Sequence, residues 1–263
     1  ELQNRMVKLA ANLSMMFNEV DFRDRFSAAS KAGFQGVEYL FPYEYQKEEL
    51  VGLLGRNNLV QVLHNLPAGN WSEGERGIAC YPGRSDEFQD GVSKAIEYAN
   101  ILGCEQLNAL AGIPPSKSDG NEVKTTFVNN LRFAADKLGE HDIYLLTEPI
   151  NTIDIPGFYL NYTEQAKSIL NDVNSKNLFI QYDIYHMQIM EGDLIRTITK
   201  NLDHIKHIQI ADNPGRHEPG SGEINYSTIF SALEDLDYDG YVGCEYIPKE
   251  STMDGIGWIQ KYR

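Results

Sequence analysis

The chain has few cysteines and no long apolar run. Its 263 residues include three cysteines, Cys80, Cys104 and Cys244, which are too widely spaced for a metal motif and cannot all pair. No apolar stretch approaches the roughly 20 residues that a membrane-spanning helix needs. Residues 1–5 also lack the basic start and apolar stretch of a signal peptide. These absences predict a cytoplasmic protein in a reducing compartment, without a membrane span.

Positive charge is also scarce. The chain carries 23 Lys and Arg against 38 Asp and Glu, for a net charge of −15. Proteins that bind nucleic acids through the phosphates normally present a basic surface, and no cluster of Lys or Arg occurs here. We therefore expect no nucleic-acid partner. An acidic surface also repels small anions, so an anionic substrate would need a metal ion or an arginine at its site.

Glycine-rich phosphate-binding motifs are absent as well. Neither GxGxxG nor GxxxxGK[ST] occurs, and the turn after the first predicted strand, residues 12–17, contains no glycine. An open doubly wound sheet that binds a nucleotide normally carries glycines at that turn. That fold and a nucleotide cofactor are both disfavoured.

Strand-like and helix-like segments alternate along the chain. Strands are predicted at residues 7–13, 36–40, 60–64, 106–110, 143–148, 178–183, 205–211 and 241–246. Helices are predicted at residues 21–32, 46–57, 86–102, 122–138, 163–173, 193–202, 226–236 and 253–262. Strands each followed by a helix, in a chain near 250 residues, indicate one α/β domain over residues 1–263, a (β/α)8 TIM barrel. The long polar connections, residues 65–85, 111–121, 149–162 and 212–225, all follow strands, which places them on the catalytic face of such a barrel.

Four late strands each end close to a side chain that can bind a metal ion. These residues are Glu148, Asp183, Gln209 and Glu245. If the strands are parallel neighbours, the four side chains converge at the mouth of the barrel. An all-oxygen set suits Mg²⁺ or Mn²⁺, whereas zinc prefers His or Cys ligands. We therefore predict a divalent metal site at this rim.

Other polar residues are expected on the same face. His186 follows Asp183 by three residues and could bind a substrate oxygen or assist proton movement. Arg216 lies in a loop rich in proline and glycine, and its two-pronged donor geometry suits a carboxylate. His64 ends the third predicted strand and Glu38 lies in the second, and both are weaker candidates for this site.

These residues and their neighbours resemble the hydroxypyruvate isomerase family, within the xylose isomerase-like TIM barrel superfamily. The resemblance spans essentially the whole chain, and no single motif carries it alone. The matching segments are residues 37–43, 64–71, 74–79, 148–151, 183–188, 207–212 and 214–226. The last of these segments is the most specific.

The resemblance implies an isomerase of small 2-oxo acids, in carbohydrate and glyoxylate metabolism. Hydroxypyruvate and 2-hydroxy-3-oxopropanoate (tartronate semialdehyde) would interconvert through a metal-stabilised enediolate. Glu148 and Glu245 would be the catalytic acid/base pair and also metal ligands, with Asp183 and Gln209 completing the metal set. His186, Arg216 and His64 would bind the substrate. Many sugar isomerases and epimerases of the superfamily carry a histidine where this chain has Gln209.

Several alternatives stay open at this point. A 2-oxo-tetronate isomerase would use the same residues on a four-carbon 2-oxo acid, and a ketose 3-epimerase would need a pocket without a carboxylate clamp. A zinc-dependent DNA repair enzyme on this barrel would need more histidines at the strand ends and a basic surface. A barrel that binds without catalysis would not need both Glu148 and Glu245. A homo-oligomer is possible, although no segment marks an interface.

Overall fold

The computed structural model describes residues 7–262. The expectation about a signal peptide in residues 1–5 lies outside the described residues. Among residues 7–262, no helix combines the length and the apolar character that crossing a bilayer requires.

The core of the molecule is a closed parallel barrel in which each strand pairs with the next and β8 pairs with β1. This confirms the predicted (β/α)8 TIM barrel. Every strand bound lies within two residues of the predicted range, and Glu148 and Glu245 come just after β5 and β8. The strands are β1 (Lys8–Asn12), β2 (Gly36–Glu38), β3 (Val60–Asn65), β4 (Gln106–Ala109), β5 (Tyr144–Thr147), β6 (Leu178–Asp183), β7 (Ile205–Ile210) and β8 (Tyr241–Cys244).

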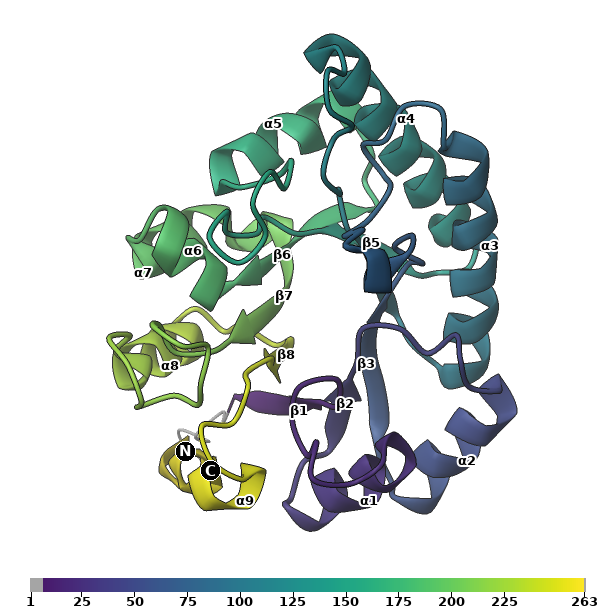
Figure 1. Cartoon of the computed structure of the whole chain (residues 1–263). Helices are drawn as coiled ribbons and strands as arrows, with labels where there is room; N and C mark the ends of the chain where they lie inside the picture. The colour runs from purple at the N-terminus through teal and green to yellow at the C-terminus, as the bar shows by residue number, and fades with distance from the viewer. Residues whose placement is uncertain (1–6, 263) are drawn as a thin grey trace.

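Helices surround the strands on the outside of the barrel (Figure 1). The α-helices are α1 (Phe22–Lys31), α2 (Lys47–Arg56), α3 (Ser85–Leu102), α4 (Gly120–Gly139), α5 (Thr163–Val173), α6 (Ile184–Met190), α7 (Leu194–Asn201), α8 (Tyr226–Asp235) and α9 (Thr252–Gly255). Short 3-10 helices are η1 (Trp71–Glu73), η2 (Leu202–His204) and η3 (Ile256–Tyr262). Two differences from the predicted helices matter. The extra helix α6 begins directly after β6, and the predicted last helix divides into α9 and η3.

The main apolar core fills the layer between the strands and these helices. A smaller apolar cluster of Ala10, Val62, Leu63 and Leu146 lies apart from it. The register between β2 and β3 shifts at one point, because Val37 pairs with Gln61 whereas Glu38 pairs with Leu63. A bulge of this kind changes which face of the strand each later residue occupies.

Candidate active site

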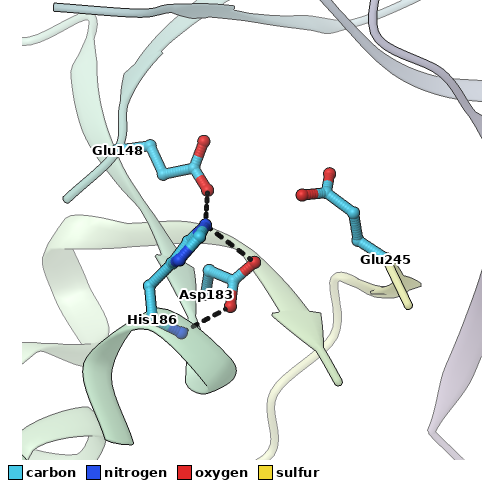
Figure 2. Close-up of side chains that lie close together, drawn as sticks. All are labelled: Glu148, Asp183, His186 and Glu245. Atoms are coloured by element: carbon cyan, nitrogen blue, oxygen red, sulfur yellow. Dashed lines mark hydrogen bonds and ion pairs between the residues drawn. The ribbon is translucent and has the colours of Figure 1, made fainter. Parts of the chain in front are cut away.

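Four buried side chains meet at the carboxyl ends of β5, β6 and β8. Glu148, Asp183, His186 and Glu245 are each at most 5% exposed, and one ligand atom from each lies within 4.8 Å of the others. Figure 2 shows the imidazole of His186 between Glu148 and Asp183, with Glu245 facing them from the opposite side. We call these four residues the rim cluster. The structure therefore brings together most of the residues that the sequence predicts for the site.

Neighbouring groups hold the carboxylates of Asp183 and Glu148 in place. Asp183 is the N-cap of α6, and its Oδ1 accepts a hydrogen bond of 3.0 Å from the backbone N–H of His186. Capping of this kind satisfies a helix N–H that has no partner within the helix. Glu148 follows β5, and its Oε1 accepts a hydrogen bond of 3.1 Å from the side-chain amide of Asn108 on β4. In each carboxylate, one oxygen is held and the other is directed into the cluster.

Three donors hold Glu245. Its Oε1 accepts from Arg216 at 2.7 Å, and its Oε2 accepts from Gln209 at 2.7 Å and from Asn12 at 3.1 Å. Arg216 places a positive charge beside the acidic cluster. Its guanidinium also lies 5.1 Å from the centre of the Tyr185 ring. These contacts fix Glu245 opposite Glu148.

Burial and like charge shift the protonation of the cluster. Burial, and then the charges of Glu245 and Asp183, raise the pKa of Glu148 well above its ordinary value of 4.5. Burial raises the pKa of Glu245 to about 8, although Arg216 opposes this change. Burial lowers the pKa of His186 from 6.5 to about 4. Carboxyl groups with raised pKa values suit proton transfer near neutral pH.

The rim cluster has the donor set of a divalent cation site. Glu148 Oε2 and Asp183 Oδ2 are buried and accept no hydrogen bond from any described residue. The Nε2 atom of His186 lies 3.7 Å from the first oxygen and 3.8 Å from the second, beyond hydrogen-bond distance. Buried carboxylates without partners are unfavourable unless a cation neutralises them. The residues present therefore fit a metal ion.

A second buried group lies beside the rim cluster. Both oxygens of Glu38 have partners, since Oε1 accepts from Asn12 at 3.1 Å and Gln209 at 2.8 Å, and Oε2 lies 2.7 Å from His207 Nε2. All four side chains are at most 1% exposed. We call this group the inner cluster; it consists of Asn12, Glu38, His207 and Gln209. Glu38, a weak candidate from the sequence, proves to be its centre.

Gln209 connects the two clusters through its amide nitrogen. That nitrogen donates to both Glu38 and Glu245, while the amide oxygen accepts from Gln181 at 2.7 Å. Two carboxylate acceptors fix this orientation, so a metal ion in the rim cluster would meet Gln209 only if the amide turned over. Gln209 as a metal ligand stays a prediction, and we leave it out of the proposed metal set.

The structure does not bring His64 to the rim cluster. His64 pairs with Leu107, and the next pair is Asn65 with Asn108, whose side chain reaches Glu148. Neighbouring residues on a strand face opposite sides, so His64 faces the helix layer. There its ring lies 6.0 Å from the ring of Tyr43, and burial lowers the pKa of His64 to about 3. We do not carry His64 into the proposed substrate site.

Several amide side chains of the site were missed from the sequence. They are Asn12, Asn108, Asn151 and Gln181, and each is at most 1% exposed. Asn12 ends β1 and Asn108 lies near the end of β4, so a search for polar residues of any kind at strand ends would have found them.

Comparisons with known proteins agree with this fold. Residues 26–262 match the model of the xylose isomerase-like TIM barrel family. Over 258 residues the chain is 54% identical to the hydroxypyruvate isomerase of Escherichia coli (strain K12), with 98% of this chain and 100% of that protein covered. The chain belongs to the hydroxypyruvate isomerase family. It is also 44% identical over 257 residues to the 2-oxo-tetronate isomerase of Cupriavidus necator, with 98% and 99% of the two chains covered.

These relatives are named isomerases, and the chain is an enzyme of the isomerase class. One solved structure that resembles it is described as an AP endonuclease, family 2, from Brucella melitensis. That protein is 47% identical, with a TM-score of 0.96, and 98% of this chain and 100% of that chain are covered. The family resemblance predicted from the sequence is confirmed.

Proposed function

We propose that the chain is a hydroxypyruvate isomerase, which interconverts hydroxypyruvate and 2-hydroxy-3-oxopropanoate. The observation that carries this proposal is the pair of buried carboxyl groups, Glu148 and Glu245, which face each other with raised pKa values. The 54% sequence identity with the Escherichia coli hydroxypyruvate isomerase, over 98% of this chain, supports the choice of substrate.

The isomerisation moves two protons between neighbouring carbons and oxygens. One of the two glutamates removes a proton from C3 of hydroxypyruvate, and the electrons of that C–H bond form the double bond of an enediolate. The same or the opposite glutamate then returns a proton to C2. A second proton passes from the C3 hydroxyl to the C2 oxygen, which leaves the aldehyde at C3. His186 lies where it can support the charge that moves between these oxygens.

Arg216 is the proposed partner of the substrate carboxylate. Its side chain is 16% exposed, it lines the cavity next to the rim cluster, and its Nε–H donates to no group of the described residues. A guanidinium holds a carboxylate through paired donors. The substrate would in this way be oriented with its reacting carbons between the two glutamates.

Glu148, Asp183 and Glu245 would hold a divalent cation, for which we propose Mg²⁺ or Mn²⁺ because the ligands are oxygens. When bound, the cation would supply Lewis-acid polarisation and neutralise the buried carboxylates. The Nε2 atom of His186 faces the same carboxylates.

The 2-oxo-tetronate isomerases of the same family make a four-carbon 2-oxo acid the second candidate substrate. The test is a substrate panel on EDTA-treated enzyme with Mg²⁺ or Mn²⁺ added back. Hydroxypyruvate is expected to give the highest kcat/KM, ahead of four-carbon 2-oxo acids and neutral ketoses. A preference for the four-carbon acid would assign the second function, and a preference for a ketose would indicate an epimerase. Cleavage of DNA at an abasic site, without isomerase activity, would overturn the proposal.

A further inference from the structure

Asn151 is completely buried behind His186, on the side away from the two carboxylates. Its side-chain Nδ2 lies 2.8 Å from Nδ1 of His186, whereas Nε2 of the imidazole faces Glu148 and Asp183. Asn151 follows the strand-end glutamate by three residues and takes no direct part in the chemistry proposed above. Its position nevertheless determines where the histidine carries its proton.

Backbone contacts fix which end of the Asn151 amide faces the imidazole. Its Oδ1 lies 3.0 Å from the backbone nitrogen of Ile153 and 2.7 Å from that of Asp154. Both of these groups are N–H donors, so the side-chain atom that faces them must be an oxygen. The other end of the amide, which faces His186, must therefore be the NH₂ group.

The orientation of the imidazole is fixed in the same way. A distance of 2.8 Å between Asn151 Nδ2 and the ring atom is that of a hydrogen bond, and a ring carbon would not fit there. The ring atom at this position is therefore Nδ1, and it must accept because the amide donates. A doubly protonated imidazole has no acceptor, and a neutral one has a single proton. With Nδ1 as acceptor, that proton is on Nε2.

We propose that Asn151 is a positioning residue that holds His186 as the neutral tautomer with its proton on Nε2. In this form Nε2 has no lone pair for a cation, so His186 is a hydrogen-bond donor at the rim cluster and not a metal ligand. Its N–H points toward the space between Glu148 and Asp183, where a substrate oxygen that gains charge would accept it. The role in catalysis rests on the proposed function, whereas the tautomer does not.

The tautomer can be read directly from ¹⁵N-labelled histidine in the full-length enzyme. Long-range ¹H–¹⁵N correlations distinguish a ring nitrogen that carries a proton from one that does not, and a His186→Gln sample identifies which signals belong to this residue. The wild-type enzyme is expected to show Nε2 protonated and Nδ1 bare. A proton on Nδ1 of wild-type His186 would overturn the proposal, whatever the activity.

Asn151→Asp provides a nearly isosteric switch. One carboxylate oxygen can still accept from Ile153 and Asp154, but the other can only accept, so Nδ1 of His186 must then carry a proton. We expect the ¹⁵N pattern at Nδ1 to change from bare to protonated. We also expect kcat to fall about 10–100-fold with little change in KM, the usual effect of removing a partner that orients a site residue.

Asn225→Asp is the matched control. Asn225 is the N-cap of α8, where its side chain accepts from the backbone N–H of Thr228, and aspartate serves equally well as a cap. This change adds the same charge and is expected to leave both the ¹⁵N pattern of His186 and kcat unchanged. If Asn151→Asp leaves Nδ1 bare, Asn151 does not position the histidine. If Nδ1 changes but no variant or wild type isomerises hydroxypyruvate, the proposed function fails and the tautomer assignment stands.

Discussion

The barrel contains two neighbouring buried groups of carboxylates and histidine that differ in whether all of their carboxylate oxygens have hydrogen-bond partners. In the inner cluster, both oxygens of Glu38 are hydrogen-bonded and His207 lies 2.7 Å away. In the rim cluster, Glu148 and Asp183 each have one oxygen without a partner among residues 7–262. The Nε2 atom of His186 lies 3.7 Å and 3.8 Å from these two oxygens.

This difference indicates that the inner cluster contributes to the stability of the fold and the rim cluster to the chemistry. Complete hydrogen bonds offset the cost of burying a carboxylate, whereas a buried carboxylate with a free oxygen is unfavourable until a ligand arrives. The inner cluster therefore serves as a support, and it reaches the rim through Gln209 and Asn12, which both also donate to Glu245. The rim cluster is the part of the barrel where we propose that a cation and a substrate bind.

The largest effect is expected from neutralising Glu148 and Glu245, the proposed catalytic pair in the rim cluster. Glu148→Gln and Glu245→Gln should each lower kcat by about 10²–10⁴-fold, because amides cannot transfer the proton. Glu148→Gln should not weaken the folded state, since it removes one of several like charges. Glu245→Gln also removes a carboxylate acceptor of Arg216, Gln209 and Asn12, so it should lower the free energy of unfolding. Steady-state kinetics and thermal unfolding would measure both effects. Retention of most of the turnover by either variant would contradict the assignment.

The inner cluster should respond in the opposite way. In Glu38→Gln, one side-chain NH₂ would face the donors Asn12, His207 or Gln209, so the free energy of unfolding should fall by about 3 kcal/mol. Turnover at a temperature where the variant is folded should fall far less than in Glu148→Gln. Denaturant titration followed by an assay would test this. Comparison with the neighbouring rim variants makes a general loss of folding easy to recognise.

Metal binding should also separate the clusters. Saturating Mn²⁺, at about 100 times its dissociation constant, should raise the free energy of unfolding by about 2.7 kcal/mol. Asp183→Asn should abolish this stabilisation, and Glu38→Gln should keep it. Thermal unfolding with and without Mn²⁺ is the measurement. Equal responses of the two variants would remove the distinction between the clusters.

Substitution of Arg216 tests whether this residue binds the substrate carboxylate. Arg216→Ala should raise KM for hydroxypyruvate about 10–100-fold, the expected loss for a hydrogen bond between charged groups. Because Arg216 also donates to Glu245, kcat should fall as well. An unchanged KM would show that the substrate carboxylate binds elsewhere.

The rim cluster should also make the stability of the metal-free enzyme depend on pH. The pKa of Glu245 is raised from 4.5 to about 8 in the folded state, so the folded protein binds more protons than the unfolded chain between these values. Its free energy of unfolding should therefore decrease as pH rises from about 4.5 to about 8. Denaturant titrations of EDTA-treated enzyme would follow the slope, which should be shallower in Glu245→Gln. An equally steep slope in that variant would assign the effect to other groups.

The acidic residues of the site could be predicted from the sequence, because the carboxyl ends of all parallel strands lie at the same end of the barrel. Asp183 ends β6, and Glu148 and Glu245 directly follow β5 and β8. The eight-fold repeat of strand and helix places such strand ends together. His186 followed from its spacing to Asp183. The sequence did not reveal α6. This helix begins directly after β6, and Asp183 at the end of that strand is its N-cap.

The face that His64 occupies and the role of Gln209 depend on tertiary detail. Without the bulge between β2 and β3, Glu38 would pair with Val62 and His64 would share the inner face; the bulge makes Leu63 the partner and turns His64 outward. Similarly, Gln209 could offer either end of its amide, and only the positions of Glu38 and Glu245 decide that the nitrogen points to them. Neither fact is encoded in local sequence spacing.

The most direct test of the contrast between the clusters is an anomalous difference map from crystals grown with Mn²⁺. We predict one peak bounded by Glu148, Asp183 and Glu245, with Nε2 of His186 outside its coordination shell, and no peak beside Glu38 and His207. A peak at the inner cluster, or none at the rim cluster at saturating Mn²⁺, would contradict the account.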